Sequence, residues 1–147
     1  MTFRNILVAS DGSDLANRAV QQAGEIAGKL GARLSVVTVS APPPSFAPSE
    51  IGWSVPATVY DELKAANAAS AKQIFAKAAS ASPAPITDTI HAESPSPAEG
   101  ILQAANELGA DLIVMGSHGH KGINRLLLGS QATKVLSLAT IPVLIVK

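Results

Sequence analysis

Short apolar segments alternate with helical patterns along the chain, and this alternation restricts the fold more than any other feature. A continuous apolar run such as Ile6–Ala9 is typical of a parallel strand that is covered on both faces. Strands that alternate with helices form a parallel sheet through right-handed crossovers. Five strands are expected: Ile6–Ala9, Leu34–Val39, Ile86–Ala92, Asp111–Met115 and Val143–Val146. The sequence therefore predicts an α/β fold, a single-domain three-layer sandwich around a five-stranded parallel sheet.

The third of these strands differs from the others. Ile86–Ala92 alternates apolar and polar residues, which indicates a strand at the edge of the sheet. Asp111–Met115 has the most apolar character and is expected to be the most deeply buried strand.

Four helices are expected between the strands. The first starts near Ser13, and Gly31 is placed to end it. Its inward residues recur every three or four positions: Ala16, Val20, Ala23, Ala27 and Leu30. The second, about Val59–Ala79, is rich in alanine, and its predicted inner face comprises Leu63, Ala66, Ser70 and Ile74.

The third and fourth helices have clearer starts. Ser96-Pro-Ala-Glu99 predicts a capping box, with Ser96 as the N-cap and Glu99 three positions later. The buried residues of the third helix are predicted to be Ile101, Leu102, Ala105 and Leu108. The fourth helix runs from Ser130 to about Ala139 and is expected to bury Val135, Leu136 and Ala139.

Composition excludes several classes of function. A chain of 147 residues with 47% hydrophobic residues fits one domain, 1–147, and its zero net charge argues against nucleic-acid binding. The lack of cysteine excludes disulfides, thiolate catalysis and cysteine-ligated zinc. No stretch resembles an export signal or the ~20 apolar residues of a membrane span. We therefore expect a cytoplasmic protein without a membrane partner.

The connection between the fourth strand and the fourth helix is the strongest functional signal. The segment 116–130 carries four of the eleven glycines of the chain. Glycines there are expected to adopt positive φ and to let backbone N–H groups approach a ligand without an obstructing Cβ. The helix N-terminus adds unpaired N–H groups and a partial positive charge. Together these features predict a phosphate-binding loop.

The spacing Gly116-x2-Gly119-x9-Gly129-Ser130 resembles the nucleotide-binding signature of the universal stress protein family. The similarity extends along the whole chain, through Ala9-Ser-Asp-Gly-Ser13, Leu126-Leu-Leu-Gly-Ser130 and Pro142-Val-Leu-Ile-Val146. The resemblance implies a Rossmann-like sheet in the order 3-2-1-4-5, with the first and fourth strands adjacent. It also implies binding of ATP, ADP or AMP, with magnesium for ATP, and a homodimer formed through the last strand.

The resemblance further implies roles for individual residues. Asp11 would serve the ribose hydroxyls or a magnesium ion, and the backbone of Val39 would bond the adenine edge. Ala9 stands where many relatives have proline, which leaves a backbone role intact. The remaining nucleotide-binding residues implied are those of the glycine loop and the helix after it: Gly116, Ser117, His118, Gly119, Gly129, Ser130, Gln131 and Ala132. Gln131-Ala132 stands where many relatives have a small residue followed by a hydroxyl residue or alanine, which leaves one side-chain phosphate contact open.

Several of these residues have a second interpretation. Gly116 and Gly119 could serve merely to shape a turn. Asp11 could simply cap the first helix, although Ser13 can also do so. His118 and His120 form a His-x-His pair, but a metal site needs further ligands. Lys121 and Arg125 could neutralise phosphate charge or be solvated loop residues. Phe46 and Trp53, in the proline-rich loop 41–56, could cover the adenine or pack at a partner surface.

The sequence offers little for catalysis. It contains no Walker Gly-Lys-Ser/Thr motif and no indicated Ser-His-Asp set, and Asp11 is the only obvious carboxylate near the expected site. A nucleotide-dependent stress-response switch is therefore favoured. The alternatives are a slow ATPase and a protein-interaction module in which the nucleotide is vestigial.

Overall fold

The computed structural model describes residues 2–44, 56–119 and 127–147. Strands and helices alternate strictly along it, as the sequence predicted. The elements are β1 (Asn5–Ala9), α1 (Asp14–Leu30), β2 (Arg33–Ser40), α2 (Ala57–Ala81), β3 (Asp88–Glu93), α3 (Pro97–Leu108), β4 (Leu112–Gly116), α4 (Ser130–Leu138) and β5 (Val143–Val146).

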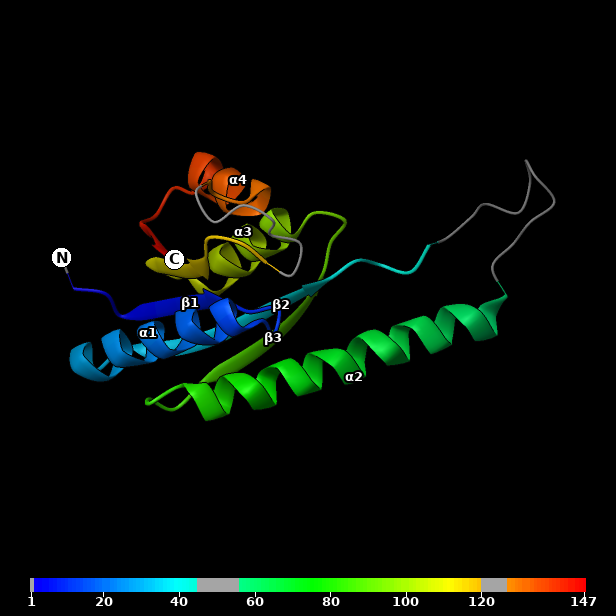
Figure 1. The fold of residues 1–147 in the computed structure, drawn as a ribbon, viewed down its shortest axis with the longest axis horizontal. Helices are drawn as coiled ribbons and strands as arrows, with labels where there is room; N and C mark the ends of the chain where they lie inside the picture. Colours follow the sequence, from blue (N-terminus) through cyan, green and yellow to red (C-terminus); the bar gives the residue numbers. More distant parts are fainter. Residues whose placement is uncertain (1, 45–55, 120–126) are drawn as a thin grey trace.

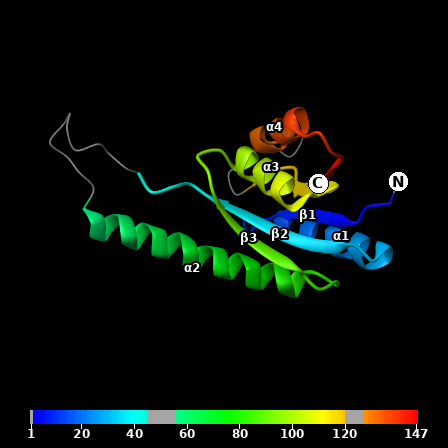
Figure 2. The same ribbon diagram turned by 180° about the vertical axis from the view of Figure 1, so that it is seen from behind.

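The five strands form one parallel sheet in the order β3-β2-β1-β4-β5. Helices α1 and α2 cover one face of this sheet, and α3 and α4 cover the other (Figures 1 and 2). The predicted three-layer α/β sandwich and its strand order are both confirmed. The chain leaves β1 for β2 and β3 on one side and returns to β4 and β5 on the other, so the strand order reverses between β1 and β4.

Burial of the central strands explains their continuous apolar character. In β1, Ile6 and Val8 pack with α1 and α2, while Leu7 packs with α3, and all three side chains have no exposed surface. Successive side chains of a strand point to opposite faces, so a strand with helices on both faces needs apolar residues at every position. The alternating strand β3 lies at one edge, as predicted, and β5 lies at the other.

Helix α1 begins and ends where the sequence indicated. The Ser13 side chain accepts a hydrogen bond from the backbone N–H of Ala16 at 3.2 Å, and Gly31 adopts a left-handed conformation with φ of 64° at the end of the helix. The prediction that Leu30 points inward is wrong, since 43% of its surface is exposed. Leu30 occupies the last position of the helix, beyond the core contact that ends at Ala27.

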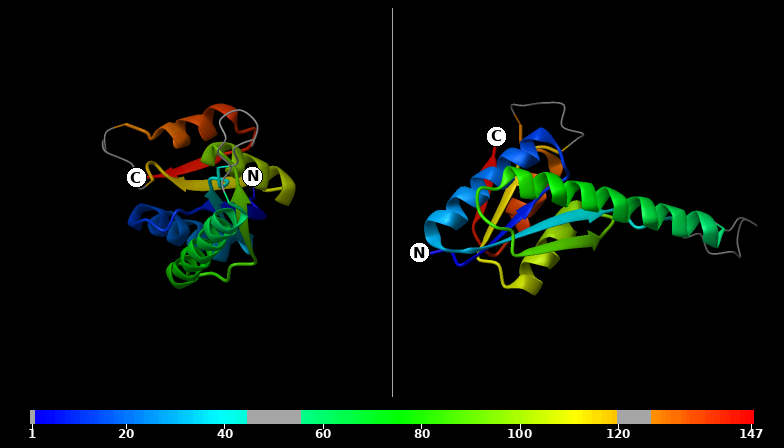
Figure 3. Two further views of the ribbon diagram at one scale, coloured as in Figure 1. Left: turned by 90° about the vertical axis from the view of Figure 1, so that its right-hand side faces the viewer. Right: turned by 90° about the horizontal axis from the view of Figure 1, so that it is seen from below.

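The inner face predicted for α2 is wrong for three of its four residues. Leu63, Ala66 and Ser70 are exposed, whereas Ile74 is partly buried, and the helix buries Ala71 and Ala78. Figures 1 and 3 show why: the N-terminal half of α2 extends past the end of the sheet, and only its C-terminal half packs on the core. In an alanine-rich helix the apolar residues do not mark one face, so periodicity carries little information there.

Two predictions for α3 and α4 need correction. Ser96 is the N-cap of α3, but its side chain makes no capping hydrogen bond, so the capping box does not form. In α4 the buried residues are Ala132 and Val135, whereas Leu136, which was predicted to be buried, is 41% exposed.

None of the helices in the described ranges has the length and apolar character required to cross a lipid bilayer.

Candidate functional site

A pocket of about 540 Å³ opens at the carboxyl ends of the central strands, beside the point where the strand order reverses. Parallel α/β sheets bind ligands at this position because the loops on either side of the reversal diverge and leave a crevice. All eleven residues predicted from the sequence lie along its wall: Ala9, Asp11, Val39, Gly116, Ser117, His118, Gly119, Gly129, Ser130, Gln131 and Ala132.

The sequence reasoning missed seven further lining residues. These residues are Ser10, Ala16, Val37, Pro95, Pro97, Ile101 and Met115. Most of them lie at a strand's carboxyl end or at the start of a helix on the same edge of the sheet. The topology alone could therefore have indicated them, once the strand order was known.

The segment that leaves β1 forms one wall of the pocket. The N–H of Gly12 donates to Ser10 Oγ at 3.1 Å, and Gly12 has a φ of 81°, which favours glycine. The N–H of Ser13 donates to Asp11 Oδ1 at 3.0 Å. Because Ser13 is the N-cap of α1, the interpretation of Asp11 as that cap is wrong, and its carboxylate lies on the pocket wall instead.

The described glycines after β4 are there for space rather than for positive φ. Among the described glycines only Gly12, Gly31 and Gly109 have positive φ, so the conformation expected for Gly116, Gly119 and Gly129 is wrong. A Cβ built on Gly129 would lie 2.9 Å from the carbonyl oxygen of Ser117, and the Gly129 N–H already donates to that oxygen at 2.7 Å. A side chain at position 129 would push apart the two ends of the loop.

The N-terminus of α4 faces this pocket without a side-chain cap. Gly129 is its N-cap, and the first hydrogen bond of the helix runs from Thr133 N–H to Gly129 O at 3.0 Å. The N–H groups of Ser130, Gln131 and Ala132 precede that bond, and all three residues line the pocket. Unpaired N–H groups at a helix start attract anions.

Part of the pocket lining is apolar. It comprises Val37, Val39, Ile101 and Met115, together with the two prolines at the start of α3. Helix α3 can approach Val39 closely because residue 100 is glycine: a Cβ there would lie 2.8 Å from both γ-carbons of Val39. The pocket thus combines apolar side chains with an anion-attracting helix start.

Two neighbouring side chains complete the glycine wall. Ser117 is 5% exposed, and its Oγ lies 3.1 Å from His118 Nδ1.

No group of three metal-ligating side chains occurs within residues 2–44, 56–119 and 127–147. The predictions for His120, Lys121, Arg125, Phe46 and Trp53 concern residues outside the described part of the chain.

The strand order and the glycine-lined pocket at its reversal define the class as a Rossmann-like α/β fold. The model of the universal stress protein family matches residues 2–147, and the chain belongs to that family. A universal stress protein of Thermus aquaticus, encoded in the QAH/OAS sulfhydrylase 3′ region, is 38% identical, with 99% of each chain covered. The universal stress protein YxiE of Bacillus subtilis is 36% identical, again with 99% of each chain covered.

Solved structures of the family superimpose on this fold. The universal stress protein UspA from Lactobacillus plantarum gives a TM-score of 0.77 at 28% identity, with 100% of this chain and 99% of that chain covered. A universal stress protein in complex with cAMP gives 0.68 at 27% identity, with 99% and 98% covered. The universal stress protein from Archaeoglobus fulgidus in complex with dAMP gives 0.59 at 26% identity, with both chains fully covered.

Proposed function

We propose that this pocket binds an adenine nucleotide, ATP or its relatives ADP and AMP, and that the protein acts as a nucleotide-dependent stress-response switch. The observation that carries the proposal is the combination of two kinds of lining in one pocket. The start of α4 offers uncapped N–H groups for phosphate, and apolar side chains offer a surface of suitable character for a base. Two structural relatives are complexes with adenine nucleotides, which supports the same ligand class here.

Each part of the nucleotide is assigned to a different group of lining residues. The adenine would lie against Val37 and Ile101, with its edge toward the backbone of Val39. The carboxylate of Asp11 would take the ribose hydroxyls, or a magnesium ion when ATP is bound. The backbone of Gly119 and the first turn of α4 would hold the phosphates.

We favour binding over hydrolysis. Hydrolysis requires a group that positions water and stabilises charge as it develops. Asp11 is the one carboxylate among the described lining residues, and its Oδ1 already accepts the N–H of Ser13. A bound nucleotide would instead order the glycine loop and so change the surface that a partner contacts.

The test is isothermal titration calorimetry with ATP, ADP and AMP, with and without magnesium, together with mass spectrometry of any nucleotide that co-purifies. Micromolar binding of at least one adenine nucleotide is expected. The proposal is overturned by the absence of binding at millimolar nucleotide. Steady phosphate release from ATP, lost in Asp11→Ala, would replace the switch with a slow ATPase.

The proposal extends to assembly and location. Within residues 2–44, 56–119 and 127–147, β5 pairs with β4 alone, and Leu144 on it is 37% exposed. An apolar strand at a sheet edge favours pairing with another copy, so we propose a homodimer through β5. We also propose a cytoplasmic protein whose ligand is the nucleotide rather than nucleic acid or a membrane.

A further inference from the structure

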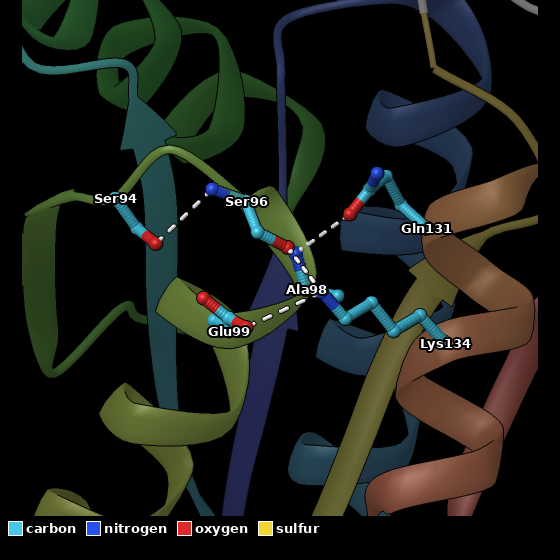
Figure 4. Close-up of polar contacts among 6 residues, drawn as sticks. All are labelled: Ser94, Ser96, Ala98, Glu99, Gln131 and Lys134. Atoms are coloured by element: carbon cyan, nitrogen blue, oxygen red, sulfur yellow. Dashed lines mark hydrogen bonds and ion pairs between the residues drawn. The ribbon is translucent and has the colours of Figure 1, made fainter.

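Gln131 joins the start of α3 to the start of α4. Its side-chain Oε1 accepts a hydrogen bond at 2.9 Å from the backbone N–H of Ala98, in the first turn of α3. Figure 4 shows this contact reaching across from α4 to α3. Gln131 therefore provides the cap that Ser96 does not provide, from 33 residues further along the chain.

The serine and glutamate of the expected capping box are occupied elsewhere. Lys134 Nζ donates to Ser96 Oγ at 3.0 Å and lies 3.3 Å from Glu99 Oε1. Figure 4 shows Lys134 directed at these two groups from the next turn of α4. Two side chains of α4 thus fix the start of α3, and the positive charge of Lys134 is paired with Glu99.

The cap decides which end of the Gln131 amide is available to a ligand. Since Oε1 is committed to Ala98, the amide nitrogen must lie on the other side, as Figure 4 shows. Across the described residues this nitrogen donates no hydrogen bond, and Gln131 lines the pocket at the uncapped start of α4. An amide nitrogen carries two N–H donors and no acceptor.

We infer that Gln131 is a phosphate-binding residue whose amide N–H groups are aimed at the nucleotide by the cap on α3. The inference rests on the proposed nucleotide site and adds a side-chain donor to its backbone donors. It also assigns the residue a preference: the amide favours ligands with charged phosphate oxygens over the bare nucleoside, since charged acceptors form the stronger hydrogen bonds.

Substitution by glutamate separates the two roles of the residue. In Gln131→Glu, a carboxylate oxygen can still accept the N–H of Ala98, and its charge suits the starts of both α3 and α4. The donors are lost, however, and a negative charge is placed beside the phosphates. Phosphate binding should therefore fall while stability is kept or rises.

The experiment compares adenosine, AMP, ADP and ATP by calorimetry and measures Tm for each variant. In Gln131→Glu we expect ATP affinity to fall at least about tenfold, adenosine affinity to stay within about twofold, and Tm to stay equal or rise. The ATP loss should shrink in about 1 M salt, where charges are screened within about 3 Å. Gln131→Met removes both roles and should lower Tm by about 2–4 °C as well as weaken ATP binding.

Gln22→Glu, on the exposed side of α1, is the matched control and should leave every affinity unchanged. Unchanged ATP affinity in Gln131→Glu would overturn the inference while leaving the nucleotide site intact. Equal losses for adenosine and ATP would overturn it too, because they would place Gln131 away from the phosphates. A wild-type protein that binds none of the four ligands would overturn the proposed function and this inference together.

Discussion

Gly119 and Asp11, which follow β4 and β1, lie against each other: a Cβ atom built on Gly119 would be 2.8 Å from Asp11 Oδ2. The other oxygen of this carboxylate accepts the N–H of Ser13 at 3.0 Å. The Asp11 side chain therefore lies between the start of α1 and the glycine loop. The pairing of β1 with β4 brings these two distant parts of the sequence together.

We predict that Gly119→Ala weakens nucleotide binding without unfolding the protein. Among the described residues the added methyl group meets the end of the Asp11 side chain and no backbone, and Gly119 itself is exposed, so we expect Asp11 to move aside. Displacing this carboxylate should reduce ATP affinity about tenfold, or about 1.4 kcal/mol. Calorimetry measures the affinity, and a Tm within about 2 °C of the wild type shows that the fold persists.

A double-mutant cycle tests the stated cause. In an Asp11→Ala background the methyl group at position 119 has no carboxylate to displace, so Gly119→Ala should have little further effect on affinity. Losses that simply add would show that the two residues act independently.

Gly129→Ala should behave differently, because its new Cβ would meet backbone rather than the end of a side chain. The Ser117 carbonyl oxygen would lie 2.9 Å away and His118 Cα 3.5 Å away. Relieving this crowding requires the loop to shift, so we predict a loss of about 1–3 kcal/mol in unfolding free energy together with weaker nucleotide binding. Urea denaturation measures the first and calorimetry the second. A variant of wild-type stability would contradict the close packing described here.

The sequence identified the strands well because each central strand is buried on both faces and must be apolar throughout. The order of the strands could not be obtained that way, since no local pattern records which strand lies beside which. That order came from the family resemblance, and it was the order that placed Asp11 beside the glycine loop. The correct prediction of the pocket residues therefore depended on the strand order as much as on the glycine motif.

The errors share a physical origin in long-range contacts. The Ser96 and Glu99 spacing favoured a capping box, but Lys134 engages both side chains and Gln131 supplies the cap. The alanine-rich helix α2 gave no sign that its N-terminal half extends past the sheet. Positive φ was expected in the glycine loop, where close approach of Gly129 to the Ser117 carbonyl is the stronger requirement.

Gly100→Ala should reveal how tightly α3 packs on β2. Alanine in a helix interior is ordinarily favoured over glycine by about 1 kcal/mol. Here its Cβ would lie 2.8 Å from both γ-carbons of Val39, and crowding of this kind costs about 1–3 kcal/mol. We predict a net loss of stability in the single variant.

Removing the Val39 γ-carbons should reverse the sign. In a Val39→Ala background, Gly100→Ala should stabilise the protein by up to about 1 kcal/mol, because only the helix preference remains. Urea denaturation of all four proteins gives both values. The same sign in both backgrounds would contradict the steric origin.

Ser35 and Ser10 offer a matched pair of buried hydroxyl groups. Ser35 is 1% exposed, and its Oγ has no hydrogen-bond partner in the part of the chain that the structure describes. Ser10 is 5% exposed, and its Oγ accepts the Gly12 N–H. We predict that Ser35→Ala raises the unfolding free energy by about 1 kcal/mol, whereas Ser10→Ala lowers it by a similar amount. Chemical denaturation measures both, and a loss of stability in Ser35→Ala would indicate a partner for its hydroxyl.

The free edge of β5 makes the proposed dimer testable with one charge. The N–H groups of Ile113 and Ser117 donate to the carbonyl oxygens of Pro142 and Val146, so these carbonyl oxygens face β4. Bonding groups alternate between the two sides of a strand, so Val143 and Ile145 direct theirs away from the sheet. A second copy can pair there only if the side chains beside that edge permit close approach.

Leu144→Lys places an ammonium group at this edge, and paired copies would bring two such charges together. We predict that sedimentation velocity shows a dimer for the wild type and a monomer for Leu144→Lys. Leu30→Lys is the matched control, since Leu30 is exposed to a similar degree, 43% against 37%, but lies at the end of α1. It should remain dimeric. Dimers in both variants would show that the interface lies elsewhere than at β5. A monomeric wild type would exclude the dimer altogether.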